Sequence, residues 1–222
     1  MLVSDVMHAD VVTIEPATSL AEAVRLAQQR GIRHLPVLDG NDLVGIVSDR
    51  DLKRAMASPA TSLSAHELRY LLDRVRIGEI MTRAVITTGP MLALEEAARV
   101  MVREKISALP VTEMGRLVGI VTETDVLDVF VRALGAGEPS SRLDVVLDGA
   151  PGALAEVVGL IAGTGASISS VVTLRNAQGL REAVVRIASI DARAAVAALR
   201  GRGYAVREAS RPVADAVAPR AS

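Results

Sequence analysis

The chain has 222 residues, of which 23% are charged and 50% hydrophobic, and its formal net charge is −1. This length suits one large or two modest domains, and the charge balance excludes a disordered chain and a general nucleic-acid binder. The lack of cysteine excludes disulfides and thiolate zinc sites and agrees with a reducing compartment. The first residues lack the basic and apolar pattern of a signal peptide, so we expect a cytoplasmic protein.

The first 134 residues contain an internal sequence repeat. Residues 45–52 are similar to residues 119–126, and the similarity extends without a gap at an offset of 74, as from Met7 to Met81. Neither copy buries its apolar faces well alone, so we expect the two to pack together. We divide this region into a first repeat at residues 1–56, a connecting helix at 57–76 and a second repeat at 77–134.

Each repeat is predicted to run strand, helix, strand, strand, helix. In the first repeat, residues 11–13 form the opening strand, Ser19 and Glu22 make a capping box that begins a helix, and Gly31 ends it. Apolar runs at 34–38 and 43–48 flank a turn at 39–42, which indicates a hairpin, and the next helix begins at Asp51. The second repeat follows the same plan, and its last helix runs to about Leu134.

Residues 135–141 are a linker by composition, and residues 142–207 are predicted to form a second domain with the order βαββαβ. This order indicates a two-layer sandwich with helices on one face of an antiparallel sheet. The long uncharged run at 157–174 contains glycines and several hydroxyl side chains, so we interpret it as helix, turn and strand and expect no membrane span. The tail at 208–222 is expected to be disordered.

The two strand-to-helix junctions of the repeats carry the candidate functional residues. Ser48 precedes Asp51 by three positions, and Thr122 precedes Asp125 in the same way. Such a pair can cap its own helix, which needs no ligand. It can also hold a ribose, because a fixed carboxylate accepts from both hydroxyls, each bond being worth roughly 1.5–3 kcal/mol before desolvation. Duplication of the pair in the same context favours the second role.

The matched Leu-Pro-Val and Gly-Ile-Val-Ser/Thr-x-x-Asp elements make residues 1–134 resemble a tandem pair of CBS domains, the Bateman module. The resemblance implies two βαββα repeats, an α/β arrangement, with an adenosine-containing ligand such as AMP, ADP, ATP or S-adenosylmethionine between them. It assigns the ribose hydroxyls to Asp51 and Asp125. The nucleotide-binding residues that we predict are Thr13, Arg33, His34, Pro36, Ser48, Arg50, Asp51, Thr87, Ala108, Pro110, Thr122 and Asp125.

Basic side chains are distributed unequally around the two junctions. Arg33, His34, Arg50, Lys53 and Arg54 surround the first, whereas the matched positions of the second repeat hold Ser107, Ala108, Thr124, Leu127 and Asp128. Because phosphates need cations, we predict unequal sites, with the first repeat supplying most of the phosphate contacts. The alternative is that these charges form a solvated helix face, as basic runs usually do.

The second domain resembles an ACT domain, a ferredoxin-like α+β fold, in residues 148–154 after a strand and again in residues 165–168. The resemblance implies side-by-side pairing of two copies and an amino-acid site at their interface. The residues that it places there are Asp148, Gly152, Ala153, Leu154, Ser167 and Ile168. Ser167 stands where the family often has asparagine, so dimerisation alone is the favoured role. The domain order CBS, CBS, ACT resembles the AcuB-like acetoin-utilisation proteins.

The sequence contains no arrangement of residues that indicates catalysis or a metal site. Its three histidines, His8, His34 and His66, are far apart and lack ligand spacing. We therefore expect a non-catalytic, homodimeric regulator without cofactor or metal, which binds an adenosine-type molecule and acts on an unidentified protein, with no nucleic-acid or membrane partner. Two alternatives remain: a ligand-free interaction module, and an amino-acid sensor acting through the ACT domain.

Overall fold

The computed structural model describes residues 1–57, 72–135 and 139–208. The chain forms two compact units, Met1–Leu127 and Asp128–Ser222, and the division falls within helix α6 (Glu123–Ala133). Most of the predicted connecting helix and nearly all of the predicted disordered tail lie outside the described residues, although residues 72–74 are helical.

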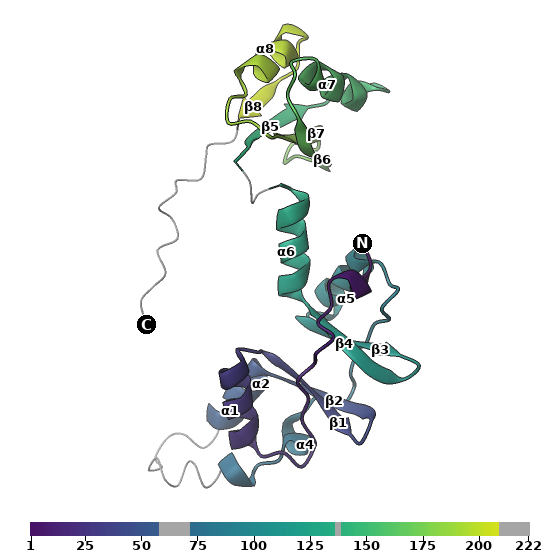
Figure 1. Cartoon of the computed structure of the whole chain (residues 1–222), viewed down its shortest axis with the longest axis vertical. Helices are drawn as coiled ribbons and strands as arrows, with labels where there is room; N and C mark the ends of the chain where they lie inside the picture. The colour runs from purple at the N-terminus through teal and green to yellow at the C-terminus, as the bar shows by residue number, and fades with distance from the viewer. Residues whose placement is uncertain (58–71, 136–138, 209–222) are drawn as a thin grey trace. The chain divides into compact units, whose positions relative to one another are not determined.

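Two similar repeats make up the first unit (Figure 1). The first repeat contains α1 (Leu20–Arg30), the hairpin strands β1 (His34–Asp39) and β2 (Asp42–Ser48), and α2 (Asp49–Ala57). The second contains α5 (Leu94–Glu104), β3 (Ala108–Glu113), β4 (Arg116–Thr122) and the start of α6. Short helical turns, η1 (Val3–Asp5) and α4 (Ile77–Ile80), lie near the start of the repeats. Each repeat is therefore a helix, a hairpin and a second helix.

Local sequence signals place most of these elements as predicted, but α2 begins at Asp49 and not at the predicted Asp51. The Ser19 side chain accepts a hydrogen bond from the backbone N–H of Glu22 at 3.2 Å, and Gly31 ends α1 in the left-handed region with φ 63°. The two hairpin turns also use positive φ, at Gly40 in the first repeat and at Met114 and Gly115 in the second. Positive φ at a two-residue turn matches the right-handed twist of the flanking strands, which fixes the register.

The predicted opening strand at residues 11–13 is wrong. In its place, one residue of each repeat makes an isolated parallel bridge with the hairpin, Ile14 with Val37 and Thr88 with Val111. The backbone of Ile14 donates to Pro36 and accepts from Leu38. The chain then turns at Pro16, whose carbonyl accepts from Gly78, so no longer ladder can form.

The first residues of each repeat pack on the other repeat. Near the N-terminus, Val3 donates its backbone N–H to Leu92 at 2.9 Å and is fully buried. In the matching place, Ile77 donates to Thr18 at 3.0 Å and belongs to the core of the first repeat. This exchange ties the two repeats together, because each core is completed by residues from a different part of the chain.

The second unit has a four-stranded antiparallel sheet in the order β6-β7-β5-β8, with α7 and α8 packed on one face (Figure 1). Its elements are β5 (Ser141–Val146), α7 (Ala153–Ala162), β6 (Ile168–Arg175), β7 (Arg181–Ile187), α8 (Arg193–Gly201) and β8 (Val206–Glu208). The predicted βαββαβ order is confirmed, and the arrangement is consistent with a ferredoxin-like domain. Leu143, Val145 and Ile187 are among the strand residues that reach the helices and form the core.

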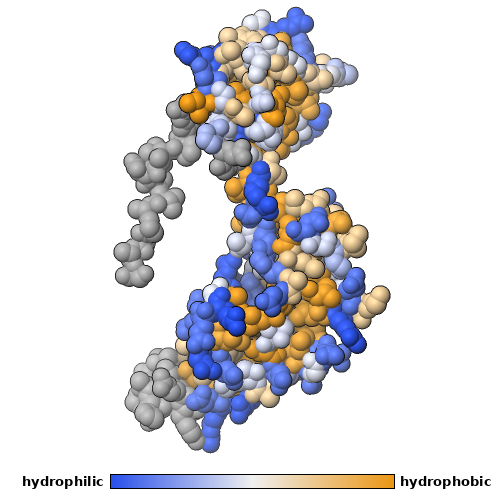
Figure 2. Space-filling view, viewed as in Figure 1, coloured by the Kyte–Doolittle hydropathy of each residue, from blue (hydrophilic) through white to orange (hydrophobic). Residues whose placement is uncertain are grey.

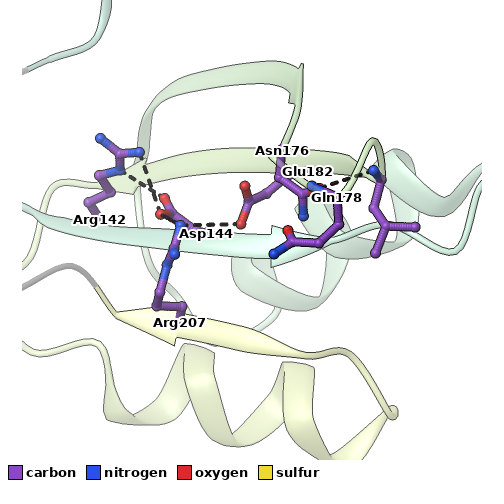
Figure 3. A network of polar contacts seen from close by, with 7 residues as sticks. Arg142, Asp144, Asn176, Gln178, Glu182 and Arg207 are labelled. Atoms are coloured by element: carbon purple, nitrogen blue, oxygen red, sulfur yellow. Dashed lines mark hydrogen bonds and ion pairs between the residues drawn. The ribbon is translucent and has the colours of Figure 1, made fainter.

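A buried carboxylate joins the short last strand to this sheet (Figure 3). Asp144 lies between two core residues of β5, so alternation places its side chain on the face away from the helices. It accepts from Arg142 Nε at 2.8 Å and from Arg207 Nη2 at 2.9 Å, and Arg207 also lies 3.6 Å from Glu182. Because β8 has only three residues, these ion pairs add to its few backbone contacts.

The hydropathy of the surface is mixed (Figure 2). Over the hairpins of the first unit, hydrophobic residues gather on the face that the figure shows, with hydrophilic residues beside them. No helix in the described parts of the chain has the length and apolar character needed to cross a membrane.

Candidate functional site

The first strand-to-helix junction is a complete capping box. Ser48 donates to Asp51 Oδ2 through its backbone N–H at 3.0 Å and through its hydroxyl at 2.6 Å, and the Asp51 N–H donates back to Ser48 Oγ at 3.3 Å. The cap therefore uses one oxygen of the carboxylate. Within the described residues, no donor contacts Oδ1 of Asp51, which leaves this oxygen for a ligand. Capping and binding are thus compatible roles for one side chain.

The second junction has the same two bonds to its carboxylate and one additional contact. Thr122 donates to Asp125 Oδ2 from its backbone at 2.7 Å and from its hydroxyl at 2.8 Å. The other oxygen, Oδ1, lies 2.9 Å from Nε2 of His8, which comes from the start of the first repeat. Both carboxylate oxygens of Asp125 are therefore occupied by the protein itself.

A cavity of about 260 Å³, the first cleft, opens beside Asp51. Its walls come from both repeats: the junction of β2 and α2 on one side, and the start of the second repeat with strand β3 on the other. Three cationic side chains, Arg50, Arg54 and Lys105, line it with a single carboxylate. The other lining residues are His34, Ile46, Ser48, Thr82, Ala84, Val85, Ile86, Ile106, Ser107, Ala108 and Pro110.

A cavity of about 320 Å³, the second cleft, opens beside Asp125. It holds one guanidinium, Arg33, and two carboxylates, Asp10 and Asp125. Arg33 Nη2 donates to Thr124 Oγ1 at 2.6 Å, so this cation is already held across the two repeats. The remaining lining residues are His8, Val11, Val12, Gly31, Ile32, His34, Ile120 and Thr122.

The structure distributes the predicted nucleotide-binding residues between the two clefts. His34, Ser48, Arg50, Asp51, Ala108 and Pro110 line the first, and Arg33, His34, Thr122 and Asp125 line the second. Thr13, Pro36 and Thr87 are not among the lining residues of either cavity, and the neighbouring apolar residues Val12 and Ile86 stand in the walls where polar ones were expected. The predicted basic cluster is also divided, because Arg33 faces the second cleft and Lys53 pairs with Asp49 at 3.0 Å.

Two residues of functional interest were missed from the sequence. Lys105 adds a third cation to the first cleft, and His8 binds the carboxylate of the second. The repeat itself could have pointed to these two residues. At the offset of 74, Lys105 matches Gly31 and His8 matches Thr82, so both are positions where the two copies differ chemically. Among the described residues, no group of three or more His, Asp or Glu side chains could hold a metal ion.

His34 lines both clefts and contacts Ser107 Oγ through Nε2 at 2.8 Å. Burial lowers the pKa of His34 below its ordinary value of 6.5, and the neighbouring Arg33 lowers it further. The neutral ring therefore predominates in the folded protein at pH 7, where it lines both clefts and shares a hydrogen bond with Ser107.

We expect the stability of the first unit to fall as pH drops below about 6.5. The unfolded chain protonates this histidine at a higher pH than the folded chain does, so its contribution is complete above the unfolded pKa and is lost as pH falls through the lowered one. Urea unfolding at pH 7.5 and 5.5 measures the difference. The His34→Gln variant should lose less stability over this range than the wild type, and equal losses would contradict the prediction.

The second unit has a separate cavity of about 440 Å³ at the loop that begins α7. Of the residues predicted from the ACT resemblance, Gly152, Ala153 and Leu154 line it, together with Arg181 and Thr173 among others. The Asp148 side chain instead accepts from the backbone N–H of Ala150 at 3.0 Å. Neither Ser167 nor Ile168 lies in the lining, and Ile168 packs against the core.

The first unit therefore contains two similar repeats and two clefts, each with a capped carboxylate in its lining. The family model for the CBS domain matches residues 3–58 and 77–132, and the chain belongs to this family. A CBS domain-containing protein of Dictyostelium discoideum is 32% identical over 143 residues, which are 64% of this chain and 99% of that protein.

Enzymes also contain related repeats. The inosine-5′-monophosphate dehydrogenase of Korarchaeum cryptofilum is 42% identical over 118 residues, 53% of this chain, but the chain spans only 22% of that enzyme. The chain is therefore similar both to a protein that consists of CBS repeats and to a part of a larger enzyme.

Two solved structures resemble the CBS pair at 32% identity. The CBS domain pair of protein MJ0100, in complex with 5′-methylthioadenosine and S-adenosyl-L-methionine, has a TM-score of 0.51 and covers 59% of this chain and 95% of its own. The AcuB protein of Vibrio cholerae has a TM-score of 0.52 and covers 61% of this chain and 93% of its own.

Proposed function

We propose that this chain is a non-catalytic, cytoplasmic regulator that binds an adenosine-containing molecule between its CBS repeats. Binding alters the balance between two arrangements of the repeats and so regulates a partner protein, in the manner of other ligand-linked equilibria. The size of this effect is limited by the difference in ligand affinity between the two arrangements.

The unused carboxylate oxygen of Asp51 is the observation that carries the proposal. A ribose presents two hydroxyl donors, and Asp51 lines a cavity that also contains apolar strand residues suited to a base. The carboxylate is held in place by its two bonds from Ser48, so little conformational entropy is lost when it binds a sugar. A cavity of about 260 Å³ is near the lower end of the volumes that small ligands occupy.

Charge favours a phosphorylated ligand in the first cleft. Arg50, Arg54 and Lys105 face one carboxylate there, and arginine and lysine are the usual partners of phosphate groups. This supports the prediction that the first junction supplies most of the phosphate contacts. The related pair of MJ0100 binds two adenosine compounds that carry a sulfur substituent, which supports adenosine as the common element and leaves S-adenosylmethionine as the competing ligand.

Calorimetric titration of ATP, AMP and S-adenosylmethionine into wild type and Asp51→Asn tests the proposal. We expect the variant to bind roughly 10–100-fold more weakly, because a charge-assisted hydrogen bond is worth about 1.5–3 kcal/mol. A 2′-deoxyribose analogue should show a similar loss with the wild type and a smaller one with the variant.

The adjacent carboxylate is the matched control. Asp49 pairs with Lys53 and does not line the first cleft, so Asp49→Asn should leave the affinity unchanged. If none of the three ligands binds, or if they bind Asp51→Asn as tightly as the wild type, the proposal is wrong. A ligand at 100 times its Kd should also add about 2.7 kcal/mol to stability, and no rise in melting temperature would favour a ligand-free interaction module.

For the second unit we propose an ACT-like role in homodimerisation. Strand β6 is an edge of the sheet, and its residues alternate between partly buried and exposed along much of its length. An edge of this length offers unpaired backbone groups to a second copy. The competing role, an amino-acid sensor, is favoured by Arg181 in the loop cavity, because a guanidinium can bind a carboxylate. A melting shift with free amino acids would support that role, and the order of domains suggests an AcuB-like link to acetoin utilisation.

A further inference from the structure

The two clefts differ at one position that the repeat makes directly comparable. Thr82 lies at the first cleft, and His8 is its counterpart at the second, by the offset of 74. The backbones of both residues are held identically: Thr82 exchanges two hydrogen bonds with Ile46, and His8 exchanges two with Ile120. The side chain is therefore the main difference between the two clefts at this point.

The backbone around His8 is fixed firmly enough to aim the imidazole. His8 forms a bridge with strand β4, and the neighbouring Met7 packs directly over Gly119, where an added Cβ would lie 2.6 Å from the Met7 sulfur. From this position Nε2 reaches Asp125 Oδ1 at 2.9 Å. Within the described chain, Thr82 makes no corresponding bond to Asp51.

The oxygen that His8 occupies is the one that a ribose would need. The Thr122 cap already uses Oδ2 of Asp125, so a ligand hydroxyl has only Oδ1 to approach. The pair is not deeply enclosed, since 64% of the His8 side chain is exposed, against 15% for Asp125. A contact of this kind weakens a competing ligand without abolishing its binding.

The surrounding charges also disfavour phosphates in the second cleft. Asp10 and Asp125 face the same space as Arg33, whose guanidinium is bonded to Thr124. An incoming phosphate would meet two carboxylates and would have to compete for the single arginine. The first cleft has the opposite balance of charge.

We propose that His8 acts as a built-in occupant of the ribose position in the second cleft, so that the chain binds one phosphorylated adenosine ligand, in the first cleft. This inference rests on the proposed function and adds that one side chain, together with the different charges of the two clefts, makes the two sites unequal. His8 is thus a specificity-determining residue for the second cleft.

Calorimetry on variants of the full chain tests the proposal by removing the histidine from the second cleft and by introducing one in the first. With the first cleft weakened by Asp51→Asn, the further change His8→Thr copies the residue of the first cleft and should raise the affinity for adenosine roughly tenfold. Adenosine is the probe because it carries no phosphate. In the reverse direction, Thr82→His should lower the affinity for ATP by a similar factor, and Thr82→Val separates the loss of the hydroxyl from the gain of the imidazole.

Each outcome has a defined meaning. One ATP per wild-type chain, a gain with His8→Thr, and a larger loss with Thr82→His than with Thr82→Val support the proposal. Two equal ATP sites in the wild type, or no effect of His8→Thr on adenosine affinity, overturn it while the proposed function stands. Failure of ATP and adenosine to bind any of these chains overturns this inference, and the proposed function falls with it only if AMP and S-adenosylmethionine also fail to bind the wild type.

Discussion

Replacing Ile77 with alanine is expected to lower the free energy of unfolding of the first unit by about 2–5 kcal/mol. Ile77 is fully buried, and although it is the first residue of the second repeat, it belongs to the core of the first repeat with Leu20 and Leu35. Truncating it removes apolar contacts and leaves a cavity that the packed neighbours fill only partly.

Urea unfolding followed by circular dichroism measures this loss, and an exposed residue provides the control. Val102 is 78% exposed on α5, so Val102→Ala should change the stability by no more than about 0.5 kcal/mol. Val3→Ala should also destabilise the unit. Val3 is the buried residue of the first repeat that matches Ile77, and it packs on the second repeat. If Ile77→Ala lost no more stability than Val102→Ala, the packing of Ile77 in the core of the first repeat would be contradicted.

Replacing Gly119 with valine is expected to destabilise the first unit by about 3 kcal/mol. Valine favours strands, and this preference alone could stabilise β4 by up to about 1 kcal/mol. However, an added Cβ would lie 2.6 Å from the Met7 sulfur and 3.2 Å from the backbone oxygen of His8. The sulfur can move, but His8 is hydrogen-bonded to Ile120, so the steric cost exceeds the gain in strand preference.

The matched control for this prediction is Gly89→Ala. An added Cβ at Gly89 would meet no atom within 4 Å, and its φ is not positive. Alanine there should be neutral or stabilising by about 0.4–1 kcal/mol, because it restricts the unfolded chain. Chemical denaturation of both variants gives the comparison, and a Gly119→Val protein as stable as Gly89→Ala would contradict the packing between the repeats.

Much of the local structure could be predicted because it depends on neighbouring residues. The cap at Ser19, the end of α1 at Gly31 and the hairpin turns each satisfy backbone groups within a few positions. The βαββαβ order predicted for residues 142–207 is also the order found in the structure. The prediction of an opening strand at residues 11–13 was wrong because a strand needs a partner along its length. The turn at Pro16 leaves only Ile14 paired with the hairpin.

The candidate site was predictable only in part for the same reason. Both capping carboxylates follow from the three-residue spacing, and the bias of charge toward the first junction follows from the unequal basic residues. Neither Lys105 nor His8 could be assigned to a cleft from its position, because each reaches a junction that belongs to the other repeat. Arg33 was grouped with the first junction because that junction is nearer in sequence. In the structure it lines the cleft at the second junction.

The amino-acid sequence by itself determined that one unit is used twice, where its helices and hairpins lie, and which two carboxylates stand at equivalent corners. These features arise from short-range hydrogen bonding and from the periodicity of apolar residues. Only the tertiary structure decided which segment completes which core, and that Oδ1 of Asp51 stays unbonded within the described chain while Oδ1 of Asp125 meets His8. Residues 8 and 125 are 117 positions apart, so their contact depends on the packing of whole repeats, which no local pattern encodes.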